Sequence, residues 1–169
     1  LNQSLFRERS IALAAGSVEV SLTSGVGILF EGPGQLEFLS ERKAHLHSGQ
    51  AVVHVPKGSG TFELETSATL LGDQGTEFGA KITHGMGTEI QVFDGHVMAS
   101  SHDEKKRQFL PQRIDAGDAV RIVMNGHTDF ERITYSPNRF LRHKDIPPGI
   151  EWPHETQKNG TNVFKKSRH

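Results

Sequence analysis

Histidines are the first residues in this sequence whose type and spacing could do chemistry. His45 and His47 are two positions apart, so both imidazoles are expected on one face of a strand, and His54 follows nearby. Two imidazoles can share a zinc ion, but a zinc site needs at least a third protein ligand in tetrahedral geometry. The apolar neighbours Val53 and Val55 predict that His54 points outward. We therefore interpret these histidines as solvated, and we predict no bound metal or cofactor.

Acidic side chains are the second group that could act chemically. Glycoside hydrolysis needs two carboxyl groups that converge across a cleft. Aspartates in turns commonly bond their own backbone instead. The acids in or beside expected turns are Asp73, Glu77, Asp94, Asp115 and Asp118. We interpret them as turn residues rather than as a catalytic pair.

Two glycine-rich motifs match functional loops only loosely. Ser59 lies in Gly-Ser-Gly, without the strand-turn-helix context of a nucleophile elbow. Residues 25–34, GVGILFEGPG, are similar to a phosphate-binding fingerprint, but no βαβ unit follows them. The sequence therefore assigns no catalytic residue, and we predict that the chain is not an enzyme.

Composition limits the class of protein. The chain has 169 residues, the length of one ordinary domain, and contains no cysteine. Its net charge is −1, and the basic runs 105–107 and 165–169 have no interleaved aromatic residues, which argues against nucleic acid as a partner. No apolar run reaches the length of a membrane span. The start at Leu1, without a leader, predicts a part excised or processed from a longer protein.

Alternating apolar residues are the main structural signal. The runs of period two, each bounded by glycine-rich turns, include Val18, Val20 and Leu22; Val26, Ile28 and Phe30; Leu36 and Phe38; Val53 and Val55; Phe62 and Leu64; Phe78, Ala80 and Ile82; Ile90 and Val92; Val97 and Ala99; and Val120 and Ile122. This pattern is typical of half-buried strands. It predicts an all-β fold of stacked, twisted antiparallel strand layers, either a β-sandwich or solenoid-like, with little helix.

The same pattern divides the chain into three parts. Residues 1–15 form a lead-in with weak helical character over 3–15, and residues 16–133 form the β domain. Residues 134–169 read as an extended, proline-containing segment over the surface and then a polar linker, partly disordered from 155 onward. A second weak helical pattern covers 137–144.

The tripeptide Gly-Thr-Glu occurs twice, ending at Glu77 and Glu89. A three-residue connection at 84–86 keeps all apolar residues of the two flanking strands on one face. It predicts the pairs Phe78–Val92, Ala80–Ile90 and Ile82–Thr88, with Lys81 opposite Glu89 on the outer face. Asp94-Gly95 is a hairpin signal that predicts a third strand paired to the second, with Val92 opposite Val97 and Ile90 opposite Ala99. The repeat is therefore interpreted as strand architecture, a three-stranded meander.

Several segments together resemble the FecR domain family. They are Gly16–Val20, Gly49–Pro56, Thr61–Thr66, Asp73–Ala80 and Thr88–Val97. The resemblance extends from Gly16 to Ile122, and Gly-Thr-Glu-Phe-Gly is its strongest element. Glu-Gly-Pro-Gly at 31–34 and Phe-Leu-Arg at 140–142 resemble in particular the versions found in planctomycetes and related bacteria. Gln74, Ala80 and Thr61 differ from the family's usual residues but keep the inside–outside pattern.

The resemblance implies a periplasmic signal-receiving domain of a membrane-anchored regulator that signals to a sigma factor through protein contact. The implied partners are the signalling domain of an outer-membrane transporter, and a sigma factor bound by a cytoplasmic segment that this chain lacks. The implied location is the periplasm, tethered to the inner membrane. The family offers no motif residue with an established ligand role.

One alternative stays open, a non-catalytic cell-envelope module that binds glycan or metal as part of a larger surface protein. Its expected signature is a groove that joins Trp152 or Tyr135 to His45 and His47.

Overall fold

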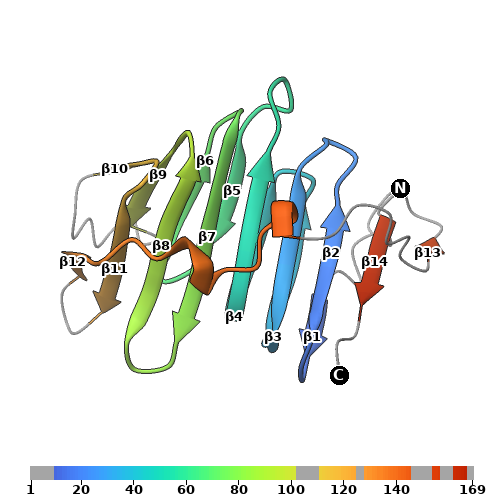
Figure 1. Ribbon diagram of the computed structural model, residues 1–169, viewed down its shortest axis with the longest axis horizontal. Coiled ribbons are helices and arrows are strands. Elements are labelled where there is room, and N and C mark those ends of the chain that lie inside the picture. Colours follow the sequence, from blue (N-terminus) through green and yellow to red (C-terminus); the bar gives the residue numbers. More distant parts are fainter. Residues whose placement is uncertain (1–9, 102–110, 125–127, 146–153, 157–161, 167–169) are drawn as a thin grey trace.

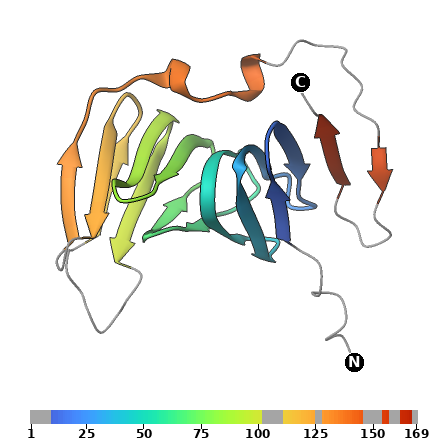
Figure 2. The ribbon, with the colours of Figure 1, turned by 90° about the horizontal axis from the view of Figure 1, so that it is seen from below.

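The computed structural model describes residues 10–101, 111–124, 128–145, 154–156 and 162–166, and within them it is almost entirely β-structure. The strands are β1 (Ser10–Leu13), β2 (Ser17–Ser21), β3 (Gly27–Ser40), β4 (Lys43–Val55), β5 (Phe62–Glu65), β6 (Ala68–Gly72), β7 (Thr76–Thr83), β8 (Gly87–Asp94), β9 (His96–Ser101), β10 (Gln112–Asp115), β11 (Ala119–Met124), β12 (Thr128–Arg132), β13 (His154–Thr156) and β14 (Asn162–Lys166). They belong to one hydrogen-bonded sheet that curls over on itself (Figure 1 and Figure 2). The predicted all-β class is confirmed.

The curled sheet forms two facing layers. The front layer contains β2, β7, β8, β11 and β12, and the back layer contains β1, β5, β6, β9 and β10 (Figure 1). The long strands β3 and β4 run through both. The pairing is antiparallel except between β4 and β5, which are parallel.

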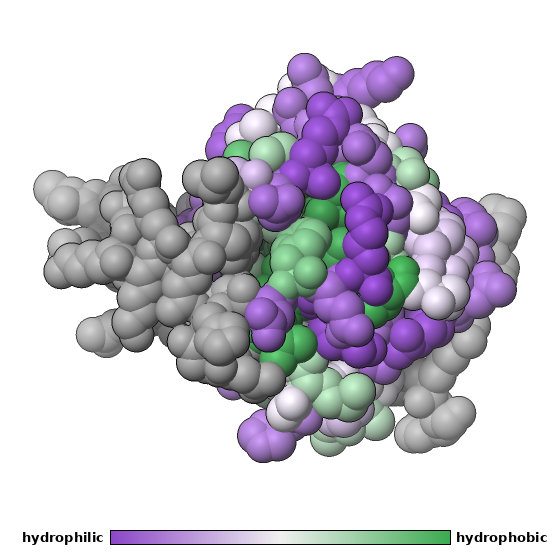
Figure 3. Space-filling model, turned by 90° about the vertical axis from the view of Figure 1, so that its left-hand side faces the viewer, coloured by the Kyte–Doolittle hydropathy of each residue, from purple (hydrophilic) through white to green (hydrophobic). Residues whose placement is uncertain are grey.

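The two layers enclose a single hydrophobic core. The alternating residues predicted from the sequence are buried in it, and only Ile82 among them remains partly exposed. Contact between the layers is close: a Cβ on Gly72 of β6 would come within 2.7 Å of the ring of Phe78 on β7. At the end formed by β10 to β12, hydrophobic side chains are visible between hydrophilic ones (Figure 3), and half-buried Phe130 packs against the core.

A glycine-rich bend carries β3 and β4 from one layer to the other. The pairing shifts register between Glu31 and Gln35, at the Gly-Pro-Gly sequence, and the facing residue Gly49 has a φ of 92°. Any side chain on Gly34 would overlap the carbonyl group of Ser48. Residues 27–34 of the motif GVGILFEGPG therefore belong to the bent strand β3, which continues to Ser40 instead of leading into a helix.

The hairpin between β7 and β8 forms as predicted. Phe78 pairs with Val92, Ala80 with Ile90, Lys81 with Glu89 and Ile82 with Thr88. Thr83 and Gly87 close the pairing around the three-residue connection. The inside–outside pattern was thus sufficient to determine this register.

The hairpin predicted at Asp94-Gly95 is wrong. β9 does not pair with β8: it lies between β6 and β10 in the back layer, and β11 pairs with β8 instead. Gly95, with a φ of 71°, supplies a corner between the layers. Val92 and Val97 both point into the core in either arrangement, which is why alternation alone could not distinguish a neighbouring strand from a facing one.

The terminal segments also differ in part from the sequence predictions. Residues 10–13, within the weak helical pattern, form strand β1 paired with β3, while residues 3–9 lie outside the described residues. The pattern over 137–144 becomes two short 3-10 turns, Pro137–Arg139 and His143–Asp145. Residues 162–166, expected in a linker, form β14 and pair with β2.

Residues 134–145, which we call the strap, follow β12 and cross the outer face of the front layer toward β2 (Figure 2). The strap combines its two 3-10 turns with short non-regular stretches. The strap is the only segment of the described chain that covers this face in both ribbon views (Figure 1 and Figure 2).

We expect Gly34→Ala to lower the free energy of unfolding by about 3 kcal/mol, because the added methyl group overlaps the backbone at Ser48. Gly58→Ala is the control: it has a φ of 83° but open space around it, and should cost about 1–2 kcal/mol from backbone strain alone. Urea denaturation of both variants checks this, and equal losses would show that the bend does not depend on close approach.

Candidate functional site

The strap is anchored to the front layer by a half-buried arginine, Arg142. The guanidinium of Arg142 donates to both carboxylate oxygens of Glu77, at 3.1 and 2.7 Å, and it lies 4.3 Å from the centre of the Phe93 ring. The side chains of Arg142 and Glu77 are only 14% and 15% exposed. The hydrogen bonds to Glu77 raise the pKa of Arg142 above its ordinary value, so this residue remains a cation.

A second arginine, Arg139, lies three residues earlier in the strap and takes part in a polar network. Arg139 donates to Oε1 of Glu89 at 2.9 Å, and the same oxygen accepts a hydrogen bond from the Gln91 amide. The carbonyl oxygen of that amide accepts from the backbone N–H of Ser136. Glu89 and Gln91 are 5% and 0% exposed, so these bonds satisfy polar groups that the strap itself buries.

Between the two arginines, Phe140 enters a small apolar cluster. Its ring, 2% exposed, packs with Leu29 and Val52 on the outer face of the front layer. A Cβ on Gly79 would lie 2.6 Å from the ring, so the glycine makes the space that Phe140 fills. The front layer therefore contacts the strap mainly through the sequence Arg-Phe-Leu-Arg, residues 139–142.

These contacts give the repeated Gly-Thr-Glu a function in the fold. Its two glutamates point outward, as the predicted register required for Glu89, but each is covered by an arginine of the strap. The register that places Lys81 opposite Glu89 is confirmed, yet Glu89 pairs with Arg139 instead of with Lys81.

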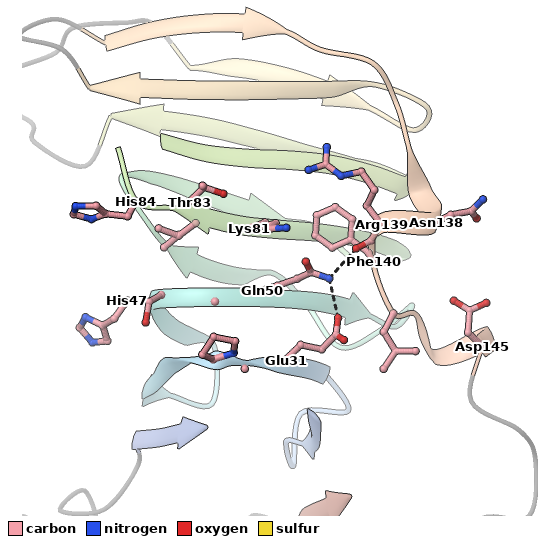
Figure 4. Close-up of a pocket in the computed structure, with 16 residues that line it drawn as sticks. Glu31, His47, Gln50, Lys81, Thr83, His84, Asn138, Arg139, Phe140 and Asp145 are labelled. Carbon is pink, nitrogen blue, oxygen red and sulfur yellow. Dashed lines mark hydrogen bonds between the residues drawn. The ribbon is translucent and has the colours of Figure 1, made fainter. Parts of the chain in front are cut away.

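A groove lies beside the strap, above the bend of β3 and β4. It has a volume of about 820 Å³, within the range of ligand pockets in general. The strap residues Arg139 and Phe140 line one side, and His47 and His84 lie at one end (Figure 4). Its floor carries polar and charged side chains from three neighbouring strands, Glu31, Gln50 and Lys81.

The predicted histidines lie on the outer faces of the sheet, where His45 and His47 come together and His54 lies apart from them. The rings of His45 and His47 stack at 4.1 Å on the back layer, where they contact Glu65 and Glu37. His45 and His47 also line a second hollow together with His84. His54 lies on the front layer, 6.2 Å from the ring of His143.

Lys43 completes the polar ladder around His45 on the back layer. Its ammonium contacts Glu63 and Glu65, and these hydrogen bonds raise the pKa of Lys43, with the bond to Glu65 making the larger contribution.

Within the residues that the structure describes, no group of three or more His, Asp or Glu side chains is arranged to hold a metal ion.

The predicted acids do not converge on one site. Asp73 and Asp94 accept hydrogen bonds from the next backbone N–H, and Asp115 and Asp118 pair with Arg113 and Arg132. The hydroxyl of Ser59 donates to the carbonyl of Pro56 in its own turn. Glu77 is the exception, and its role as a strap anchor was not predicted.

The groove expected for a glycan or metal module is not formed by Tyr135. Its ring packs near Phe93 on the front layer, 6.4 Å between centroids, whereas His45 and His47 stack on the back layer. Trp152 lies outside the described residues.

Across the described ranges, no helix is long and apolar enough to cross a bilayer.

Comparison with known proteins supports one family. Residues 33–98 match the family model described as FecR protein. No curated protein matches the chain. The resemblance to FecR seen in the sequence is thus confirmed by the family match, which covers the bend, the β7–β8 hairpin and both glutamates that anchor the strap.

Two crystal structures of a candidate anti-sigma factor from Parabacteroides distasonis ATCC 8503 share the fold. They superpose with TM-scores of 0.58 and 0.59 at 17% and 18% sequence identity, and the matches cover 75% of this chain. The chain spans 60% of the length of each of those chains. At this identity the likeness establishes the fold alone.

We expect Arg142→Ala to lower the free energy of unfolding by about 2–3 kcal/mol, because it leaves the Glu77 carboxylate covered and unpaired. Arg132→Ala removes an ion pair to Asp118 whose arginine is 75% exposed, and it should cost less than about 1 kcal/mol. Thermal and urea unfolding distinguish the two, and similar small losses would mean that the strap is not held by this pair.

We expect Phe140→Ala to cost about 3–5 kcal/mol if the strap unfolds together with the domain. If the strap detaches first, amide hydrogen exchange should rise in 134–145 and over the covered parts of β4 and β7, with the amides of β5 and β6 unchanged. Unchanged exchange in the strap would contradict the anchoring role of Phe140.

Proposed function

We propose that this FecR-like chain is the periplasmic signal-receiving domain of a membrane-anchored regulator, and that it acts by protein–protein contact. The observation that carries the proposal is the FecR match over residues 33–98. The fold shared with a candidate anti-sigma factor agrees with a regulatory role.

The site also supports recognition rather than catalysis. Its most elaborate feature is a face that holds a polypeptide segment outside the sheet, the strap, through two ion pairs and a buried aromatic ring. Such a face reads side chains at spaced positions along a chain, which is how extended segments are recognised in general. We propose that the chain is not an enzyme.

In this proposal the chain receives its signal from the signalling domain of an outer-membrane transporter. It passes the signal through an inner-membrane anchor to a cytoplasmic segment that binds a sigma factor. The anchor and that segment belong to the longer parent protein. The longer length of the solved structures with this fold is compatible with such additional parts.

We expect the purified chain to form a one-to-one complex with the isolated signalling domain of a transporter from the same genome. Native mass spectrometry would detect it, and His45→Ala with His47→Ala should leave the complex intact. A stoichiometric zinc or oligosaccharide adduct that this double variant loses, without any protein complex, would instead establish the cell-envelope binding module.

A further inference from the structure

Among the described residues, the groove beside the strap is lined by two opposite charges that lack an ion-pair partner. Glu31 on β3, Gln50 on β4 and Lys81 on β7 are cross-strand neighbours, so they form one row across three strands. In the part of the chain that the structure describes, neither Glu31 nor Lys81 forms an ion pair, although both are half-buried. Half-buried charges lose hydration, and an oppositely charged ligand group would compensate that loss.

The residue between them is already fixed. The side-chain amide of Gln50 donates to Glu31 Oε2 at 2.8 Å and to the carbonyl oxygen of Arg139 at 3.1 Å, which links the floor of the groove to the strap (Figure 4). Glu89, opposite Lys81, is bound by Arg139 and Gln91. Lys81 is therefore the cation of this row that could pair with a ligand carboxylate, and Glu31 is the anion that could pair with a ligand cation.

The shape of the groove fits an extended chain better than a sugar. Its wall is itself a polypeptide segment that makes no strand pairing, the strap, and this segment crosses the same strands. Phe140 is the one Phe, Tyr or Trp side chain that lines the groove, and it is 2% exposed, so it offers no stacking platform. Backbone and side-chain groups of Ser48, Thr83 and Asn138 provide polar contacts along its length.

We propose that this groove binds an extended segment of a partner protein with a carboxylate over Lys81 and a cation over Glu31. Neighbouring strands are about 4.8 Å apart, so the two charges are separated by roughly 10 Å. A chain in the extended polyproline II conformation has three residues per turn and rises about 3.1 Å per residue, so its side chains three positions apart point the same way over about that distance. The ligand is thus an acidic and a basic side chain three positions apart. The proposal rests on the proposed function only in assigning the segment to a signalling partner.

The probe is a capped hexapeptide, Gly-Glu-Ser-Ser-Lys-Gly, titrated into the isotope-labelled chain and followed by two-dimensional NMR. We expect chemical shift changes at amides of residues 48–50 and 81–84, and none with the same peptide carrying Gln at both charged positions. Lys81→Glu should weaken binding at least tenfold, whereas Lys57→Glu, at an exposed loop position, should leave it unchanged.

The double variant Lys81→Glu with Glu31→Lys separates recognition from misfolding. A peptide can lie in either direction, so the reversed charges should restore binding of the same peptide. Absence of shifts at the groove, equal binding of the neutral peptide, or failure of the double variant to restore binding would overturn the inference. Capture of a signalling domain by a Lys81→Glu chain would place the partner contact elsewhere and leave the proposed function standing.

Discussion

The fold depends on the close approach of two backbones at the bend of β3 and β4. One sheet can enclose a core only if some strands pass between its layers, and here two neighbouring strands do so side by side. Side chains are excluded from that crossing, because Gly34 lies against the backbone at Ser48 and Gly49 takes a positive φ. The consequence extends to the groove, whose floor is built on the same crossing.

The strap adds a second, polar constraint to the front layer. Burying a carboxylate is unfavourable unless it is paired, so the coverage of Glu77 and Glu89 requires the two arginines. Removing one partner of either pair therefore costs more free energy of unfolding than the intact pair contributes on balance. This asymmetry favours specificity: a segment with other residues at these two positions would leave a covered charge without a partner.

The sequence was sufficient for the core and for one register, but not for the site. Alternation identified the buried residues, and the β7–β8 hairpin followed because a wrong loop length would expose its apolar face. The strand after Gly95 was misassigned because facing and neighbouring strands bury the same residues. The strap anchors were missed for a different reason: Arg139 and Arg142 lie 50 and 65 residues from their glutamates, beyond any local pattern.

The late position of the strap has a consequence for synthesis. Residues that it covers, such as Leu29 and Val52, emerge from the ribosome long before Phe140 does. The edge of β2, at residues 17–21, likewise pairs with residues 162–166. Until residues 134–145 and 162–166 have emerged, the nascent domain presents an apolar face and an open strand edge, a combination prone to aggregation. Because these residues are translated after the surfaces that they cover, their docking is the step that protects the domain from aggregation.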